Sequence, residues 1–98
     1  MKVRYTRRAR ANLDDVLAYV AQDSRAKADR LAARIRAAIK RISSHPGSGR
    51  RTDIPEIRQV NTWPFPYLIF YRAGSSELTI IAIRHGSRNP RTMPAKSI

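Results

Sequence analysis

The sequence predicts an α+β fold in which an antiparallel helical hairpin packs on one face of a sheet. Apolar residues recur at helical spacing in two consecutive segments between residues 7 and 42, and three segments after residue 56 are rich in aromatic and β-branched residues. Both helical stripes need an apolar surface, which a sheet supplies. We therefore expect an N-terminal strand, the helical hairpin and a three-stranded antiparallel meander.

The first half of the chain predicts one short strand and two helices. Residues 2–5 alternate and indicate a strand, and Thr6 is suited to cap a helix that begins near residue 7. The apolar pattern pauses at residues 22–24, where capping residues separate the two helices. The apolar stripes consist of Ala9, Leu13, Val16, Leu17 and Val20 in the first helix and Ala28, Leu31, Ile35, Ile39 and Ile42 in the second.

The second half predicts a long loop followed by the meander. Turn-forming residues without periodicity fill residues 43–56, so we expect a loop that carries Arg50 and Arg51. Gly86 should end the last strand, and residues 87–98 should form a loose basic tail of one domain that spans residues 1–98. The three strands are expected at residues 57–61, 67–72 and 78–85, with a turn at residues 74–76.

The charge of the chain indicates an acidic partner. The 98 residues include 20 Lys and Arg against 7 Asp and Glu, which gives a net charge of +13, and 16 of the 20 bases are Arg. The guanidinium group binds phosphate and carboxylate through two parallel hydrogen bonds. Nucleic acid, a ribosome or an acidic protein segment would suit this composition.

The sequence also predicts the location of the protein and the absence of a metal or other cofactor. No segment has the ~18 consecutive apolar residues of a membrane helix, and the first residues lack the apolar core of a signal peptide. We therefore expect a cytoplasmic protein with no membrane partner. Cysteine is absent, and His45 and His85 show no ligand spacing, so we expect neither a metal nor another cofactor.

Only one group of residues suggests catalysis. The adjacent carboxylates Asp14 and Asp15 point apart on a helix, and no Ser-His-Asp arrangement is present. His85 could act as general acid or base in a metal-free ribonuclease whose phosphate is held by nearby arginines. The alternative is a polar residue at the end of a strand. The arginines on or just beyond the expected strands are Arg58, Arg72, Arg84 and Arg88.

Strand alternation argues against a single site for these groups. Successive strand residues face opposite sides of a sheet. We therefore expect Arg84 and His85 to point in opposite directions unless Gly86 lets the strand end twist. On a regular strand, Arg84 would share a face with Leu78, Ile80 and Ala82, and His85 would share one with Thr79, Ile81 and Ile83.

Two further features could contact a partner. Trp63 lies in a connection with two prolines, where it would either project as a partner surface or pack over the end of the core. The second feature is a basic face of the second helix, which could contact an acidic partner or be a solvated surface. That face consists of Lys27, Arg30, Arg34 and Arg41.

Two segments near the C-terminus carry a family resemblance. They are PYLIFYR at residues 66–72 and ELTIIAIRHGSRN at residues 77–89. Together they resemble the C-terminal signature of the RelE/ParE toxin superfamily, and in detail that of its ParE branch. The N-terminal strand, the helical hairpin and the loop with its Gly49-Arg50 pair occur in the order that the superfamily implies.

The resemblance implies a toxin of a type II toxin–antitoxin system. Such a toxin is made with a cognate antitoxin whose acidic, initially disordered C-terminal segment wraps around it and folds. A basic domain with amphipathic helices suits that partner. The residues expected to bind the antitoxin are Leu13, Leu17, Arg30, Arg34 and Trp63.

The two branches of the superfamily imply different targets. Members of the RelE type are ribosome-dependent endoribonucleases of messenger RNA, whereas ParE-type members are taken to inhibit DNA gyrase by binding it. The strand at residues 67–71 carries Leu68 where the ribonucleases usually have an arginine, and no tyrosine follows Tyr71. We therefore expect a non-enzymatic gyrase inhibitor. Its target-binding residues would be Arg84, His85, Arg88 and Arg91.

Two alternatives stay open. One is a RelE-type nuclease that acts on ribosome-bound messenger RNA with His85 as acid or base and Arg58, Arg72 and Arg84 on the phosphate. The other is a plain nucleic-acid binder, whose affinity would depend steeply on salt.

Overall fold

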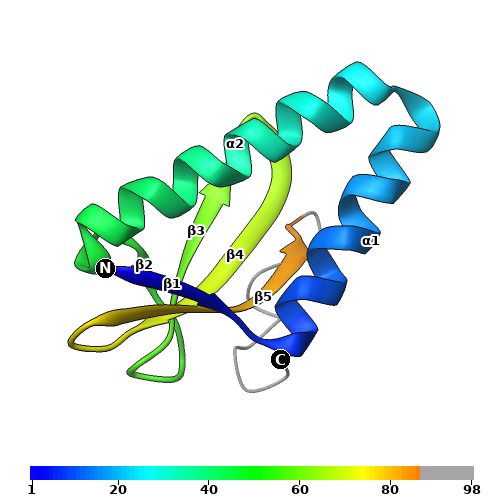
Figure 1. Cartoon of the computed structure of the whole chain (residues 1–98). Helices are drawn as coiled ribbons and strands as arrows, with labels where there is room; N and C mark the ends of the chain where they lie inside the picture. The colour runs from blue at the N-terminus through cyan, green and yellow to red at the C-terminus, as the bar shows by residue number, and fades with distance from the viewer. Residues whose placement is uncertain (87–98) are drawn as a thin grey trace.

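Two helices cross one face of a five-stranded sheet in the computed structural model, which describes residues 1–86 (Figure 1). The elements are β1 (Lys2–Tyr5), α1 (Arg7–Asp23), α2 (Arg25–Ser44), a 3₁₀ helix (Pro46–Ser48), β2 (Arg50–Arg51), β3 (Arg58–Thr62), β4 (Phe65–Ala73) and β5 (Glu77–His85). The strand order is β1-β5-β4-β3-β2, with β1 parallel to β5 and every other pair antiparallel. The predicted α+β architecture is confirmed.

The two helices begin at hydroxyl caps. The Thr6 side chain accepts a hydrogen bond from the Ala9 N–H at 3.0 Å, and the Ser24 side chain accepts one from the Lys27 N–H at 3.1 Å. The Ser24 N–H also donates to the Val20 carbonyl at 3.0 Å, so one residue ends α1 and caps α2. Each such cap contributes about 1 kcal/mol. The predicted break at residues 22–24 is confirmed as a joint of one residue.

The core lies between the helices and the sheet, and α2 supplies more of it than α1. Leu31 and Ile42 of α2 are fully buried, whereas Leu13, Val16 and Leu17 of α1 are half-buried and pack against the edge of the core. The sheet contributes from its helix-facing side. Its buried side chains in this cluster are Tyr67, Ile69, Tyr71, Leu78, Ile80 and Ile83.

The expected loop at residues 43–56 contains regular structure, which corrects the prediction. A 3₁₀ helix is followed by β2, whose Arg50 and Arg51 pair with Gln59 and Arg58 of β3. A strand of two residues is too short to produce a periodic pattern, so nothing in the local sequence distinguishes it from a turn. The sheet therefore has one more strand than the meander and the N-terminal strand together.

A β-bulge in β5 corrects the predicted facing of its side chains. Phe70 pairs with Ala82 while Tyr71 pairs with Ile80, so Ile81 is an extra residue and the alternation shifts there. Leu78, Ile80 and Ile83 consequently all join the helix-side core. Arg84 therefore does not share a face with Leu78 and Ile80, as a regular strand would require.

The bulge does not change the opposite orientation of the last two side chains of β5. Arg84 shares its face with Ala82, and His85 shares the helix-facing side with Ile83. Arg84 and His85 therefore point to opposite sides, as predicted, although the neighbours of each differ from the expected ones.

Neither helix in residues 1–86 combines the length and the apolar character needed to cross a membrane.

Candidate functional site

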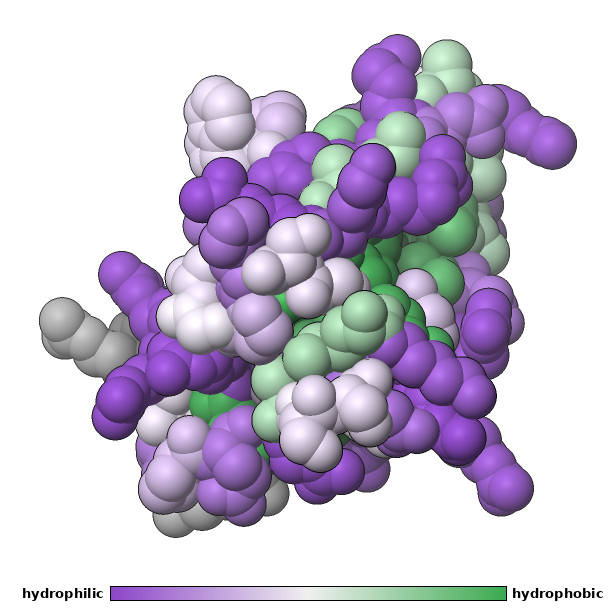
Figure 2. Space-filling model, turned by 60° about the vertical axis from the view of Figure 1, so that its left-hand side comes forward, coloured by the Kyte–Doolittle hydropathy of each residue, from purple (hydrophilic) through white to green (hydrophobic). Residues whose placement is uncertain are grey.

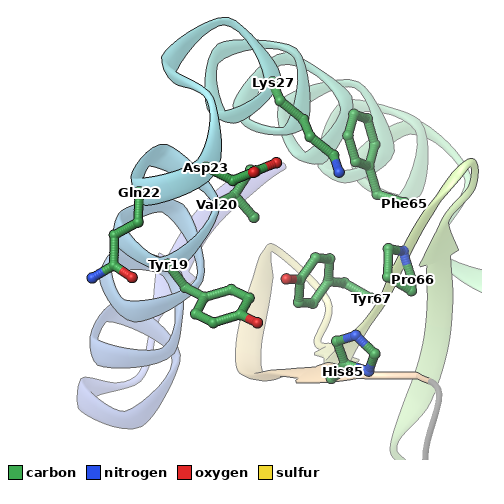
Figure 3. A pocket seen from close by; sticks show the side chains of 9 residues that line it. All are labelled: Tyr19, Val20, Gln22, Asp23, Lys27, Phe65, Pro66, Tyr67 and His85. Carbon is green, nitrogen blue, oxygen red and sulfur yellow. The ribbon is translucent and has the colours of Figure 1, made fainter.

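A cavity of about 520 Å³ opens between the α1–α2 joint and the ends of β4 and β5 (Figure 3). In Figure 3, Tyr19 reaches from α1 toward Tyr67 of β4, and His85 lies beside Tyr67. The volume falls within the range of small-ligand sites and of pockets that accept partner side chains. The lining residues are Tyr19, Val20, Gln22, Asp23, Lys27, Phe65, Pro66, Tyr67 and His85.

Strand pairing places His85 in this cavity. His85 is opposite Tyr67 in the β4–β5 register, and the Gly86 N–H donates to the Pro66 carbonyl at 2.6 Å, which closes the pair just beyond the strand end. The His85 and Tyr67 rings meet edge to face, with centroids 5.2 Å apart and planes at 82°. Such a contact orients the imidazole and contributes about 1 kcal/mol.

The phenol of Tyr67 stays protonated over the physiological range. Burial raises the pKa of the Tyr67 hydroxyl, and the neighbouring Tyr19 raises it further. The cavity therefore presents two phenols and an imidazole, which can donate and accept hydrogen bonds.

The formal charges in the cavity balance. Lys27 and Asp23 both line it, so it lacks the concentrated positive charge of a phosphate clamp. Within residues 1–86, no group of three or more His, Asp or Glu side chains is arranged to hold a metal ion. The arrangement suits a polar or aromatic side chain of a partner better than it suits a transferred phosphate.

The sheet arginines of the proposed nuclease site lie apart from His85. Arg58 is on the helix-facing side and donates from Nη1 to the Gly49 carbonyl at 2.9 Å. Arg84 lies on the opposite face, across from Leu68, and exposed Arg72 lies on that face four residues farther along β4. That spacing corresponds to roughly 13 Å. The structure therefore does not bring Arg58, Arg72, Arg84 and His85 into one site.

The structure does not place all the residues expected to contact an antitoxin on one surface. Leu13 and Leu17 are half-buried against the core, which gives them a structural role. Arg34 and Trp63 come together, because the Arg34 Nε donates to the Trp63 carbonyl at 2.8 Å. Trp63 is 75% exposed on the β3–β4 turn, so it projects rather than covering the core. Arg30 is exposed on α2.

Two of the expected target-binding residues, Arg88 and Arg91, lie outside the described residues. Of the other two, only His85 lines the cavity.

Sequence reasoning singled out His85 but missed the side chains around it. Tyr19 lies off the apolar stripe of α1 and is 70% exposed, and Tyr67 is far from α1 along the chain. The one signal in the sequence that could have indicated this cavity is Tyr19 itself, a large aromatic residue outside the apolar stripe and near the end of α1. Lys27, identified as part of a basic face, is also a lining residue.

The family model and the two relatives that the chain resembles all carry the name of a toxin. The family model described as "ParE toxin of type II toxin-antitoxin system, parDE" matches residues 3–90. The chain is 34% identical over 84 residues to "Putative toxin Y4kP" of Sinorhizobium fredii, covering 86% of each chain. It is 32% identical over 87 residues to "Toxin RelE2" of Caulobacter vibrioides, covering 89% of this chain and 97% of that protein.

A solved structure extends the similarity to the fold. The structure is titled "Chromosomal ParDE TA system from P. aeruginosa" and superposes with a TM-score of 0.73 at 26% identity. The match covers 87% of this chain and 95% of that chain.

Proposed function

Because this chain belongs to the ParE toxin family of type II toxin–antitoxin systems, we propose that it arrests growth by binding DNA gyrase rather than by cutting RNA. Membership of the family implies a cognate antitoxin as partner. The gyrase target and the surface that contacts it are the parts we propose. Gyrase acts on the chromosome, so the expected site of action is the cytoplasm.

One observation carries the choice of a binder over a nuclease. A metal-free nuclease needs its general acid or base and its phosphate-binding cations around one phosphate. His85 faces the helices, whereas Arg84 and Arg72 lie on the other face of the sheet and Arg58 already binds a backbone carbonyl. Leu68, which pairs with Arg84, is apolar at a position where a further cation would help to bind the phosphate.

We assign gyrase contact to the end of β5 and the cavity beside it. His85 and the phenols of Tyr19 and Tyr67 supply hydrogen-bonding groups on aromatic rings, a composition enriched at energetically important points of protein interfaces.

Gyrase inhibition tests the proposal directly. Purified toxin should inhibit supercoiling by gyrase and increase the yield of cleaved DNA complexes, and addition of the cognate antitoxin should reverse both effects. Tyr19→Ala should weaken inhibition, whereas Arg36→Gln, an exposed change on α2, should not. If supercoiling and cleavage are unchanged at micromolar excess of folded toxin, gyrase is not the target.

A second candidate function has one observation in its favour. His85 shares a cavity with two phenols, and imidazole and phenol are both able to move protons. In a ribosome-dependent nuclease, His85→Ala would abolish messenger cleavage in a translation extract. Absence of cleavage by the unaltered protein in the same extract, assayed beside gyrase, would remove this candidate.

We further propose that the acidic segment of the antitoxin binds the surface formed by Arg30, Arg34 and Trp63. The two arginines supply charge and the exposed indole supplies an apolar anchor, which together fit an acidic amphipathic segment.

A further inference from the structure

A second cavity, of about 270 Å³, lies near the β2 edge of the sheet, where β2, β3 and β4 adjoin. It has no residue in common with the cavity that holds His85. The lining residues are Ser48, Gly49, Arg50, Gln59, Val60, Asn61 and Leu68.

The strand register places the polar lining side chains on the sheet face opposite the helices. Val60 packs against the helix-side core, so its neighbours Gln59 and Asn61 point the other way. Arg50 pairs with Gln59, and Leu68 pairs with Asn61. Because paired residues of antiparallel strands share a face, these four side chains form one continuous surface.

The surface continues across the sheet to a second arginine. Leu68 of β4 pairs with Arg84 of β5, so Asn61, Leu68 and Arg84 form a row across three neighbouring strands. In strand order, Arg50 and Arg84 thus lie on this face on opposite sides of Gln59, Asn61 and Leu68.

Among the residues that line this cavity, Arg50 is the one with a charged side chain. Its lining offers a guanidinium, two amides and a hydroxyl, and no carboxylate. Of the acidic residues, Asp14, Asp15, Asp23 and Asp29 lie on the helices, Asp53 and Glu56 lie between β2 and β3, and Glu77 begins β5, where it is paired with Arg4 at 3.0 Å. Figure 2 shows hydrophilic side chains over much of the molecular face that it presents, with hydrophobic ones between them.

We propose that the cavity lined by Arg50, Gln59 and Asn61 binds the phosphate backbone of DNA. Arginine forms paired, charge-assisted hydrogen bonds with phosphate oxygens, and amide and hydroxyl side chains commonly complete such contacts. The net charge of +13 would strengthen them through release of condensed counterions. The toxin would then contact DNA through this cavity and gyrase through the end of β5.

We assign this cavity to DNA because the acidic segment of the antitoxin is already assigned to a different surface, that of Arg30, Arg34 and Trp63. The volume of about 270 Å³ has room for one phosphodiester with its sugar, the repeating unit of the DNA backbone. The adjoining Leu68 offers an apolar contact that a sugar ring can cover.

The test is binding of the purified, antitoxin-free toxin to a short fluorescent DNA duplex, followed by anisotropy at several salt concentrations. Arg50→Gln should weaken binding roughly tenfold at low salt, as expected for one charge-assisted hydrogen-bonding group. It should also reduce the slope of log affinity against log salt by about 0.9, the contribution of one phosphate. Gln59→Ala should weaken binding without changing that slope.

The matched control is Arg36→Gln, which removes the same charge from the exposed side of α2. A charge there is screened over about 8–10 Å, so it should alter affinity by less than about twofold. Equal losses in Arg50→Gln and Arg36→Gln would mean diffuse charge attraction and overturn the proposal. Arg50-dependent binding of an RNA hairpin or a polyglutamate peptide, with none to duplex DNA, would also overturn it.

The DNA-binding assay contains no gyrase, so its result does not depend on whether gyrase is the target of the toxin. Duplex binding that survives a failed gyrase assay would leave the cavity assignment standing and remove only the gyrase target.

Discussion

The hydroxyl of Tyr71 holds the backbone of Gly49, 22 residues earlier in the chain. It accepts a hydrogen bond from the Gly49 N–H at 3.0 Å and donates one to the Pro46 carbonyl at 2.7 Å. Arg58 donates to the Gly49 carbonyl at 2.9 Å, so both backbone polar groups of this buried glycine are satisfied by side chains. These contacts position β2 and hence Arg50 at the second cavity.

Gly49→Ala should destabilise the fold. A methyl group at Gly49 would overlap the Tyr71 hydroxyl and lie 2.7 Å from its Cε1 atom. The ring is buried and has no room to retreat, so we expect a loss of about 1–3 kcal/mol in the free energy of unfolding, measured by urea denaturation. The control is Gly47→Ala, where nothing lies within 4 Å of the added carbon and no comparable loss is expected. Equal stabilities of the two variants would contradict the packing described for Tyr71.

Tyr71→Phe should lower the free energy of unfolding by about 1–3 kcal/mol. It removes one hydroxyl and leaves the buried Gly49 N–H and the partly buried Pro46 carbonyl without that partner. Tyr19→Phe removes an equivalent hydroxyl from a side chain that is 70% exposed and should be nearly neutral. A neutral result for Tyr71→Phe would mean that water replaces the hydroxyl.

Stability should fall at alkaline pH. Burial raises the pKa of the Tyr71 hydroxyl, an effect that the hydrogen bond from Gly49 and the charge of Arg58 offset only in part. A tyrosine in the unfolded chain ionises near pH 10, whereas folded Tyr71 stays protonated to higher pH. The folded state then binds more protons, so the free energy of unfolding declines as pH rises above about 10 and is unaffected below that range.

Burial also raises the pKa of the Tyr67 hydroxyl, which acts in the same direction. Urea denaturation from about pH 8 to about pH 11 measures the decline. The decline in the free energy of unfolding should be shallower in Tyr71→Phe. An identical decline in that variant would mean that other groups cause the loss of stability.

Thr6→Ala should destabilise both α1 and the β5 bulge. The Thr6 hydroxyl accepts from the Ala9 N–H and donates to the carbonyl of the bulged residue Ile81 at 2.8 Å. Losing a cap and a partly buried hydrogen bond together should cost about 1–3 kcal/mol in thermal or urea unfolding. Thr6→Ser keeps both bonds and should retain most of the stability. If Ser and Ala variants are equally unstable, the methyl group of Thr6 matters more than its hydroxyl.

Trp63→Ala should weaken antitoxin binding with little effect on stability. An exposed indole that becomes buried in an interface contributes about 2 kcal/mol or more, so the dissociation constant measured by calorimetry should rise about thirtyfold. Because Trp63 is 75% exposed in the free toxin, its truncation should change the unfolding free energy by less than about 0.5 kcal/mol. Tyr19→Ala alters the other exposed aromatic, and a larger effect there would move the antitoxin surface to α1.

Local patterns in the sequence determined most of the secondary structure. The helical stripes, the caps at Thr6 and Ser24, and the aromatic and β-branched runs of β4 and β5 act over a few residues, and all of them are found in the structure. The family membership was also readable from residues 66–89, because strands β4 and β5 carry distinctive side chains.

Contacts between distant residues decided the rest. The parallel pairing of β1 with β5, the addition of β2 and the bulge at Ile81 each depend on partners far away in the chain. Thr6 binds the Ile81 carbonyl across 75 residues, and the Asn12 side chain accepts from the Ile83 N–H across 71. Because a bulge reverses every later side chain on its strand, these bonds to β5 determine which core residues share a face with His85. Residue order alone carries no record of that reversal, so only the folded chain shows that His85 lies with Tyr19 and Tyr67.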